Sequence, residues 1–128
     1  MADIEKKFRF RKFPVYKDSR IFAREVKKLA RDKFPKYELF ALTNQLSRAA
    51  DSIILNIAEG CDRGTDKDFA HFLNNSHTSL NEVVACLDVA LDEGYITENE
   101  NHEQLSKAAE LANQLTAFRE SILKDLKK

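Results

Sequence analysis

The sequence is poor in the residues that interrupt regular structure: its 128 residues include three glycines, two prolines and no tryptophan. A sheet with many tight turns would need more glycine and proline, so the composition favours helices. No apolar run is long enough to span a membrane, and residues 1–16 lack the apolar core of a signal peptide. We therefore expect one cytoplasmic domain without membrane contact.

Motifs that carry chemistry are equally scarce. Cys61 and Cys86 lack the CxxC spacing of metal and redox sites, so we expect two reduced thiols. His71 and His77 are six residues apart, whereas a metal pair on one helix needs a spacing of three or four. Glycine-rich phosphate loops and nucleophile elbows are missing as well. The sequence predicts a non-enzymatic protein that has no catalytic residues and binds no cofactor or metal.

The prediction of the fold starts from residues 45–60, QLSRAADSIILNIAEG. At about 100° per residue they place an apolar stripe on one side of a helix. Its members are Leu39, Leu42, Leu46, Ala49, Ala50, Ile53 and Ile57. Polar residues lie along one flank at spacings of three and four. We expect Gly60 to end this helix in the left-handed conformation.

Further signals divide the chain into four helices, at roughly 15–33, 37–59, 65–93 and from 97 to the C-terminus. Phe34-Pro35 ends the first. Thr65 is a predicted N-cap, Gly94 a predicted C′ residue, and Thr97 with Glu100 a capping box. The last helix carries the apolar stripe Leu105, Ala108, Ala112, Leu115, Ile122 and Leu126. The predicted fold is all-α: an antiparallel up-and-down four-helix bundle at residues 15–128, preceded by a short extended N-terminal arm at residues 1–14.

The polar flanks of the second and third helices lie in the same rotational sense from their stripes, so they are expected to face each other. We name their residues the polar seam: Gln45, Arg48, Ser52, Asn56, Glu59, Ser79 and Glu82. In a bundle interior these groups must satisfy one another. We expect a buried Arg48–Glu82 ion pair that fixes helix register and partner choice; a binding or catalytic role is the alternative.

The formal net charge of zero conceals two opposite ends. Residues 1–36 hold 13 Lys and Arg against 5 Asp and Glu, whereas residues 37–128 hold 8 against 16. The two parts neutralise each other within or between subunits, or the first forms a surface for nucleic acid. The basic and aromatic arm either grips phosphates and bases or packs its Phe side chains on the bundle. Candidate nucleic-acid contacts are Lys6, Lys7, Arg9, Arg11, Lys12, Arg24, Lys27, Lys28 and Arg31.

Three apolar residues lie opposite the stripes of the second and third helices: Leu55, Ala85 and Val89. One exposed Leu has little meaning alone. Together the three would form an outer apolar strip, which is a candidate oligomer interface.

Several motifs also carry a family likeness. The residues are Phe10–Tyr16, Phe34–Glu38, Leu42, Gln45–Ala50, Ser52-Ile53, Asn56–Gly60, Arg63, Phe69, Phe72-Leu73, Ser79, Glu82 and Gly94–Ile96. This pattern resembles the four-helix-bundle proteins called 23S rRNA-intervening sequence proteins, which are encoded in bacterial ribosomal RNA genes or free-standing. Thr78 departs from the glycine usual in such proteins, which argues against a very close helix approach there.

The resemblance implies a bacterial protein that forms a ring-like homopentamer and has no attached enzymatic activity. A related, strongly basic accessory protein works with a reverse transcriptase, so nucleic acid or a nucleic-acid enzyme is a second implied partner. We therefore expect a self-assembling interaction or scaffold module whose main partner is itself. The alternative is an RNA-binding accessory protein that uses the basic arm and the first helix.

Overall fold

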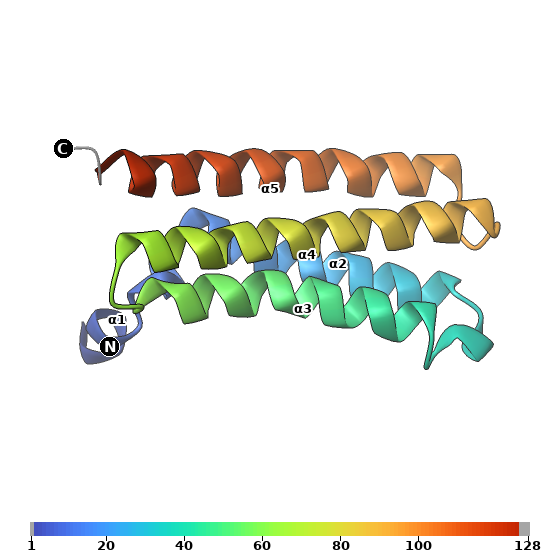
Figure 1. Cartoon of the computed structure of the whole chain (residues 1–128). Helices are drawn as coiled ribbons and strands as arrows, with labels where there is room; N and C mark the ends of the chain where they lie inside the picture. The colour runs from blue at the N-terminus through green and yellow to red at the C-terminus, as the bar shows by residue number, and fades with distance from the viewer. Residues whose placement is uncertain (1, 126–128) are drawn as a thin grey trace.

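The computed structural model describes residues 2–125, and this part of the chain is helical without a β-strand. A short helix α1 (Ala2–Lys7) and a 3₁₀ helix η1 (Arg9–Lys12) precede the bundle. The long helices are α2 (Pro14–Lys33), α3 (Leu42–Cys61), α4 (Asp66–Asp92) and α5 (Glu98–Asp125), with the 3₁₀ helix η2 (Lys36–Glu38) between α2 and α3. Successive long helices run in opposite directions (Figure 1). The predicted all-α four-helix bundle is therefore confirmed.

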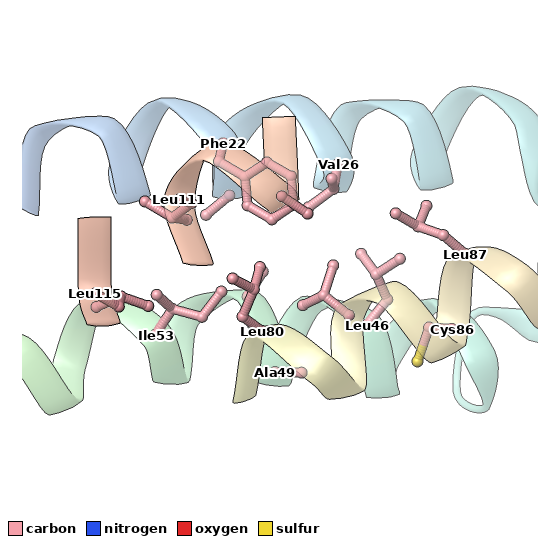
Figure 2. Packing of buried hydrophobic residues seen from close by; sticks show 14 of the residues in the cluster. Phe22, Val26, Leu46, Ala49, Ile53, Leu80, Cys86, Leu87, Leu111 and Leu115 are labelled. Carbon is pink, nitrogen blue, oxygen red and sulfur yellow. The ribbon is translucent and has the colours of Figure 1, made fainter. Parts of the chain in front are cut away.

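All four long helices contribute to one apolar core. Figure 2 shows Phe22 of α2, Ile53 of α3, Leu80 of α4 and Leu115 of α5 facing a common interior. Ile53, Leu80 and Leu115 are almost completely buried, and each such side chain contributes roughly 1.5–3 kcal/mol of transfer free energy. The predicted stripes lie in this core with one exception on α3, described below. Leu126, the last predicted member of the α5 stripe, lies outside the described residues.

The predicted helix ends after α3 are confirmed. Thr65 caps α4, because its side-chain oxygen accepts a hydrogen bond of 3.1 Å from the Asp68 amide. Gly94 follows α4 with φ of 78°, in the left-handed region. Thr97 and Glu100 exchange two hydrogen bonds, of 2.9 and 3.1 Å, and form the expected capping box at the start of α5.

The start of α3 differs from the prediction: the helix begins at Leu42, not at residue 37. Residues 36–41 form a tight turn that we name the Phe40 turn. Its Glu38 carboxylate accepts hydrogen bonds from the Leu42 amide at 3.3 Å and from the Tyr95 hydroxyl at 2.8 Å. These bonds favour the turn over a continuing helix, and Leu39 consequently leaves the predicted stripe with 52% of its surface exposed.

Gly60 also has a different role from the one predicted. It lies inside α3, which continues through Cys61, and its φ is not positive. A Cβ atom at Gly60 would lie 2.5 Å from the Cβ of Phe72 on α4. The glycine therefore permits a close approach of two helices. Thr78 lies six residues further along α4, where its side chain is exposed and its hydroxyl donates to the Asn74 carbonyl of the same helix at 3.1 Å.

The arm is helical, which makes the predicted extended conformation wrong. Acidic Asp3 and Glu5 lie in the first turn of α1 and Lys6 and Lys7 in its last, an order that suits the helix dipole. The segment η1 lies against α2 and α3, whereas α1 contacts only η1 among the described elements. Phe10 and Phe13 pack on the core from this position.

The close approach at Gly60 predicts a loss of stability for Gly60→Ala. Overpacking costs roughly 1–3 kcal/mol, which exceeds the gain of up to about 1 kcal/mol that alanine has over glycine inside a helix. We expect a lower urea midpoint for unfolding, with an unchanged slope. The control is Gly64→Ala, where a Cβ meets no atom within 4 Å. A stabilised Gly60→Ala protein would contradict the packing role.

Candidate functional site

The centre of the polar seam is a small hydrogen-bonded cluster between α3 and α4. The hydroxyls of Ser52 and Ser79 are 2.8 Å apart. The Asn56 amide donates to the Ser52 carbonyl at 2.8 Å and to the Ser52 hydroxyl at 3.0 Å. All three side chains are half-buried, so the two flanks meet at this level of the bundle as expected.

The ends of the seam are exposed, and the expected buried ion pair is wrong. Arg48, Glu59 and Glu82 all lie at the surface. Arg48 and Glu82 line the same cleft of about 380 Å³, but they form no ion pair within 4.0 Å among the described residues. Instead, Gln45 donates to Glu82 at 3.5 Å. Flank residues remain hydrated here because they stand at the outer edge of the helix contact.

A fully buried serine provides a polar contact that the sequence analysis did not identify. Ser76 of α4 donates to the Ile53 carbonyl of α3 at 2.8 Å. Because the acceptor is a backbone atom, the contact requires the two helices to lie close together. Its only sequence signal is a small polar residue inside an apolar stripe.

Most of the arm's cations have carboxylate neighbours. Lys7 pairs with Asp3 at 3.7 Å, Lys12 with Glu5 at 3.5 Å. Arg9 approaches Asp62 at 3.9 Å and donates to the Cys61 carbonyl at 2.8 Å. The two contacts of Arg9 connect the arm to the end of α3 and to the turn that follows it. Lys6 and Arg11 are exposed.

The predicted cations of α2 divide into two groups. Lys27 and Lys28 form ion pairs of 2.7 Å with Asp51 and Asp32. Arg24 and Arg31 are exposed and lack a carboxylate within 4.0 Å in the described part of the chain. Lys17 and Arg20, which the sequence analysis did not single out, share both properties. We name these four the basic ridge: Lys17, Arg20, Arg24 and Arg31.

The three outward apolar residues are all exposed, but they do not form one strip. Leu55 and Val89 have 63% and 46% of their surface exposed. Ser52 lies opposite Ser79, so Leu55 is level with residue 76 of the antiparallel α4. At 1.5 Å per residue, Ala85 and Val89 are then about 14 and 20 Å further along the bundle. Leu55 therefore belongs to a different part of the surface.

Two apolar features escaped the sequence analysis. The Phe40 side chain has 91% of its surface exposed, because the turn directs it away from the core. The sequence contains one indication of this exposure: at about 100° per residue, Phe40 does not lie on the side of the helix that carries the α3 stripe. The second feature, which we name the apolar recess, has a volume of about 350 Å³ and is lined by Phe13, Pro14, Val15, Gln114, Ala117 and Phe118.

Titratable groups offer little for catalysis. Cys61 and Cys86 are both buried and free of disulfides, and burial raises the pKa of both thiols, which disfavours the reactive thiolate. Within residues 2–125, groups of three His, Cys, Asp or Glu that could hold a metal ion do not occur. None of the helices in this part is long and apolar enough to cross a lipid bilayer.

The chain matches the family model described as "23S rRNA-intervening sequence protein" over residues 11–117. It belongs to this family. A crystal structure from Bacteroides thetaiotaomicron VPI-5482, titled as a protein of unknown function from the S23 ribosomal protein family, matches with a TM-score of 0.72 and 23% identity. The match covers 82% of this chain and 97% of that one, and it supports the fold. Curated proteins provided no match. The bundle of this 23S rRNA-intervening sequence protein is thus shared with a solved structure, and that match concerns the fold alone.

The geometry of the seam predicts different couplings for its two residue pairs. In double-mutant cycles, Ser52→Ala with Ser79→Ala should show a coupling of roughly 0.5–1.5 kcal/mol, as for a neutral hydrogen bond. Arg48→Ala with Glu82→Ala should show less than about 0.5 kcal/mol, because both groups are hydrated and unpaired. Urea unfolding of the wild type and of each single and double variant measures both values. A coupling free energy of several kcal/mol between Arg48 and Glu82 would contradict this expectation and support the originally predicted buried ion pair.

Proposed function

We propose that the chain is a non-enzymatic, self-assembling helical bundle that acts as an interaction module. The observation that carries the proposal is the placement of its exposed large apolar side chains. Tyr37, Leu39 and Phe40 lie on the Phe40 turn and Val89 on the last turns of α4 at the same end, and we name these four the apolar cluster. Ile4 and Phe8 lie on the arm at the other end, and Ile21 and Leu55 lie along α2 and α3. Exposed apolar groups that gather in this way are typical of protein contacts.

The division of charge supports association between unlike surfaces. Five exposed carboxylates lie along α4, and we name them the acidic surface of α4: Asp66, Asp68, Glu82, Asp88 and Asp92. They belong to a different helix from the basic ridge of α2, so one copy can present its cations to the carboxylates of the next. Such head-to-tail contacts close into rings when the rotation between neighbours allows it. A homopentamer is the closed ring that we propose, with its number taken from the resemblance of the sequence to ring-forming proteins.

The self-assembly proposal predicts a mass well above that of the 14.7-kDa monomer in light scattering coupled to size exclusion. Val89→Glu should lower this mass, because it places a charge within the apolar cluster. Leu55→Glu tests the separate apolar site on α3 in the same way. The matched control, Ala109→Glu on the exposed side of α5, should leave the mass unchanged. A wild-type protein that stays at the 14.7-kDa monomer mass in concentrated solution would refute the proposal.

A second candidate function is binding of nucleic acid, most simply RNA, along the basic ridge. The observation that favours it is the regular spacing of its four cations on one side of α2, with Lys17, Arg20 and Arg24 around a surface recess of about 300 Å³. Cations without carboxylate partners are free to replace the counterions of phosphates. The neutralised arm residues are weaker candidates than the ridge.

The ridge predicts a graded effect of charge removal in electrophoretic mobility shifts with RNA of mixed sequence. Arg24→Ala and Arg31→Ala should each weaken binding and lower the slope of log affinity against log salt by about 0.7–0.9. Lys28→Ala, which removes a cation already paired with Asp32, should have a smaller effect. No shift of the wild-type protein at low salt would exclude this function.

A further inference from the structure

The Phe40 turn presents an exposed aromatic side chain on a hydrogen-bonded backbone at one end of the bundle. The Leu39 amide donates to the Lys36 carbonyl at 3.1 Å, and the Ala41 amide donates to the Glu38 carbonyl at 2.9 Å. The Glu38 carboxylate ties the turn to α3 and to Tyr95. A backbone ordered in this way loses little conformational entropy when the turn binds, which favours its use to present an anchor side chain.

The apolar recess is lined by the start of α2 and by residues 114–118 of α5. Both segments lie toward the end of the bundle opposite the Phe40 turn (Figure 1). Five of its six lining residues are apolar, and the amide of the sixth, Gln114, already donates to Asp18 at 2.9 Å. The rings of Phe13 and Phe118 meet edge to face with centroids 5.1 Å apart. A cavity of roughly 150 Å³ binds benzene in another protein, so a recess of about 350 Å³ has room for a third ring.

Charge at the two ends is complementary. Residues 88–98 carry four carboxylates and no Lys or Arg, whereas residues 1–17 carry six Lys or Arg and two carboxylates. Lys7, Arg9 and Lys12 pair with Asp3, Asp62 and Glu5, so the cations of this end that lack a carboxylate within 4.0 Å in the described part of the chain are Lys6, Arg11 and Lys17. The first segment forms the turn between α4 and α5 beside the Phe40 turn, and the second forms the arm beside the recess. End-to-end approach of unlike ends is therefore favoured, and approach of like ends is opposed.

We infer that Phe40 of one copy inserts into the apolar recess of the next copy, which makes a head-to-tail contact. The inference rests on the proposed self-assembly and identifies two surfaces that carry it. A single copy cannot make the contact with itself, because α2, whose 20 residues span about 30 Å, separates the two ends. In a two-fold dimer each copy would place its Phe40 in the recess of the other, whereas in the ring proposed above the same contact runs head to tail.

The absence of tryptophan from the sequence allows a direct test with Phe40→Trp, which introduces a single fluorophore at the anchor position. Its emission should shift to shorter wavelength, and its quenching by acrylamide should fall, as the protein concentration rises through assembly. Adding Ala117→Asp, which puts a carboxylate in the recess, should keep the tryptophan in water. Adding Ala109→Asp, which lies elsewhere on α5, should leave the blue shift and the reduced quenching of the tryptophan unchanged.

Light scattering on the same samples separates the possible outcomes. Phe40→Ala should weaken assembly roughly tenfold to hundredfold, the value expected for one buried aromatic side chain, and Phe40→Leu should recover part of it. An oligomer of the Phe40→Trp protein whose introduced tryptophan stays exposed, or a Phe40→Ala protein that assembles as tightly as wild type, would overturn this contact while leaving self-assembly intact. A monomeric wild-type protein would overturn both.

Discussion

The close approach of α3 and α4 is the contact on which the rest of the bundle depends. These helices share the most extensive interface of the described elements, and α2 and α5 pack against this pair. Gly60 brings the backbone of α3 against Phe72 at one end, and Ser76 reaches the Ile53 carbonyl further along. Small groups at these positions let the larger side chains of all four helices meet in one close-packed interior.

Much of this arrangement was predictable, because amphipathic periodicity reports which side of a helix is buried. Within residues 2–125 the predicted stripes lie in the core apart from Leu39, and the caps at Thr65, Gly94 and Thr97 follow from local backbone chemistry. Gly60 was misassigned because the same residue type serves two needs: a left-handed turn and a short distance between helices. The periodicity of apolar residues does not report the distance between neighbouring helices, so it does not distinguish these two roles of a glycine.

The candidate sites were predicted less completely. The rotational position of the seam was correct, yet Arg48 is exposed because a position on the flank does not reveal where the neighbouring helix surface ends. Ion pairs, too, could be predicted from the sequence only in part. The spacing of Lys28 and Asp32 shows from sequence that they can pair, since residues four apart are neighbours on a helix. The pairs Lys27–Asp51 and Arg9–Asp62 join distant segments, so the cations that remain free emerge only from the fold.

The two proposed functions are physically linked through the basic ridge. If α2 faces the acidic surface of a neighbouring subunit, its cations are neutralised and unavailable to phosphates. If the contact between subunits lies at the ends instead, through Phe40 and the apolar recess, each copy keeps its ridge exposed. Four cations per subunit would bind nucleic acid weakly, but several ridges in one assembly would act at high effective concentration on the same strand. The place of the interface therefore decides whether assembly opposes or strengthens nucleic-acid binding.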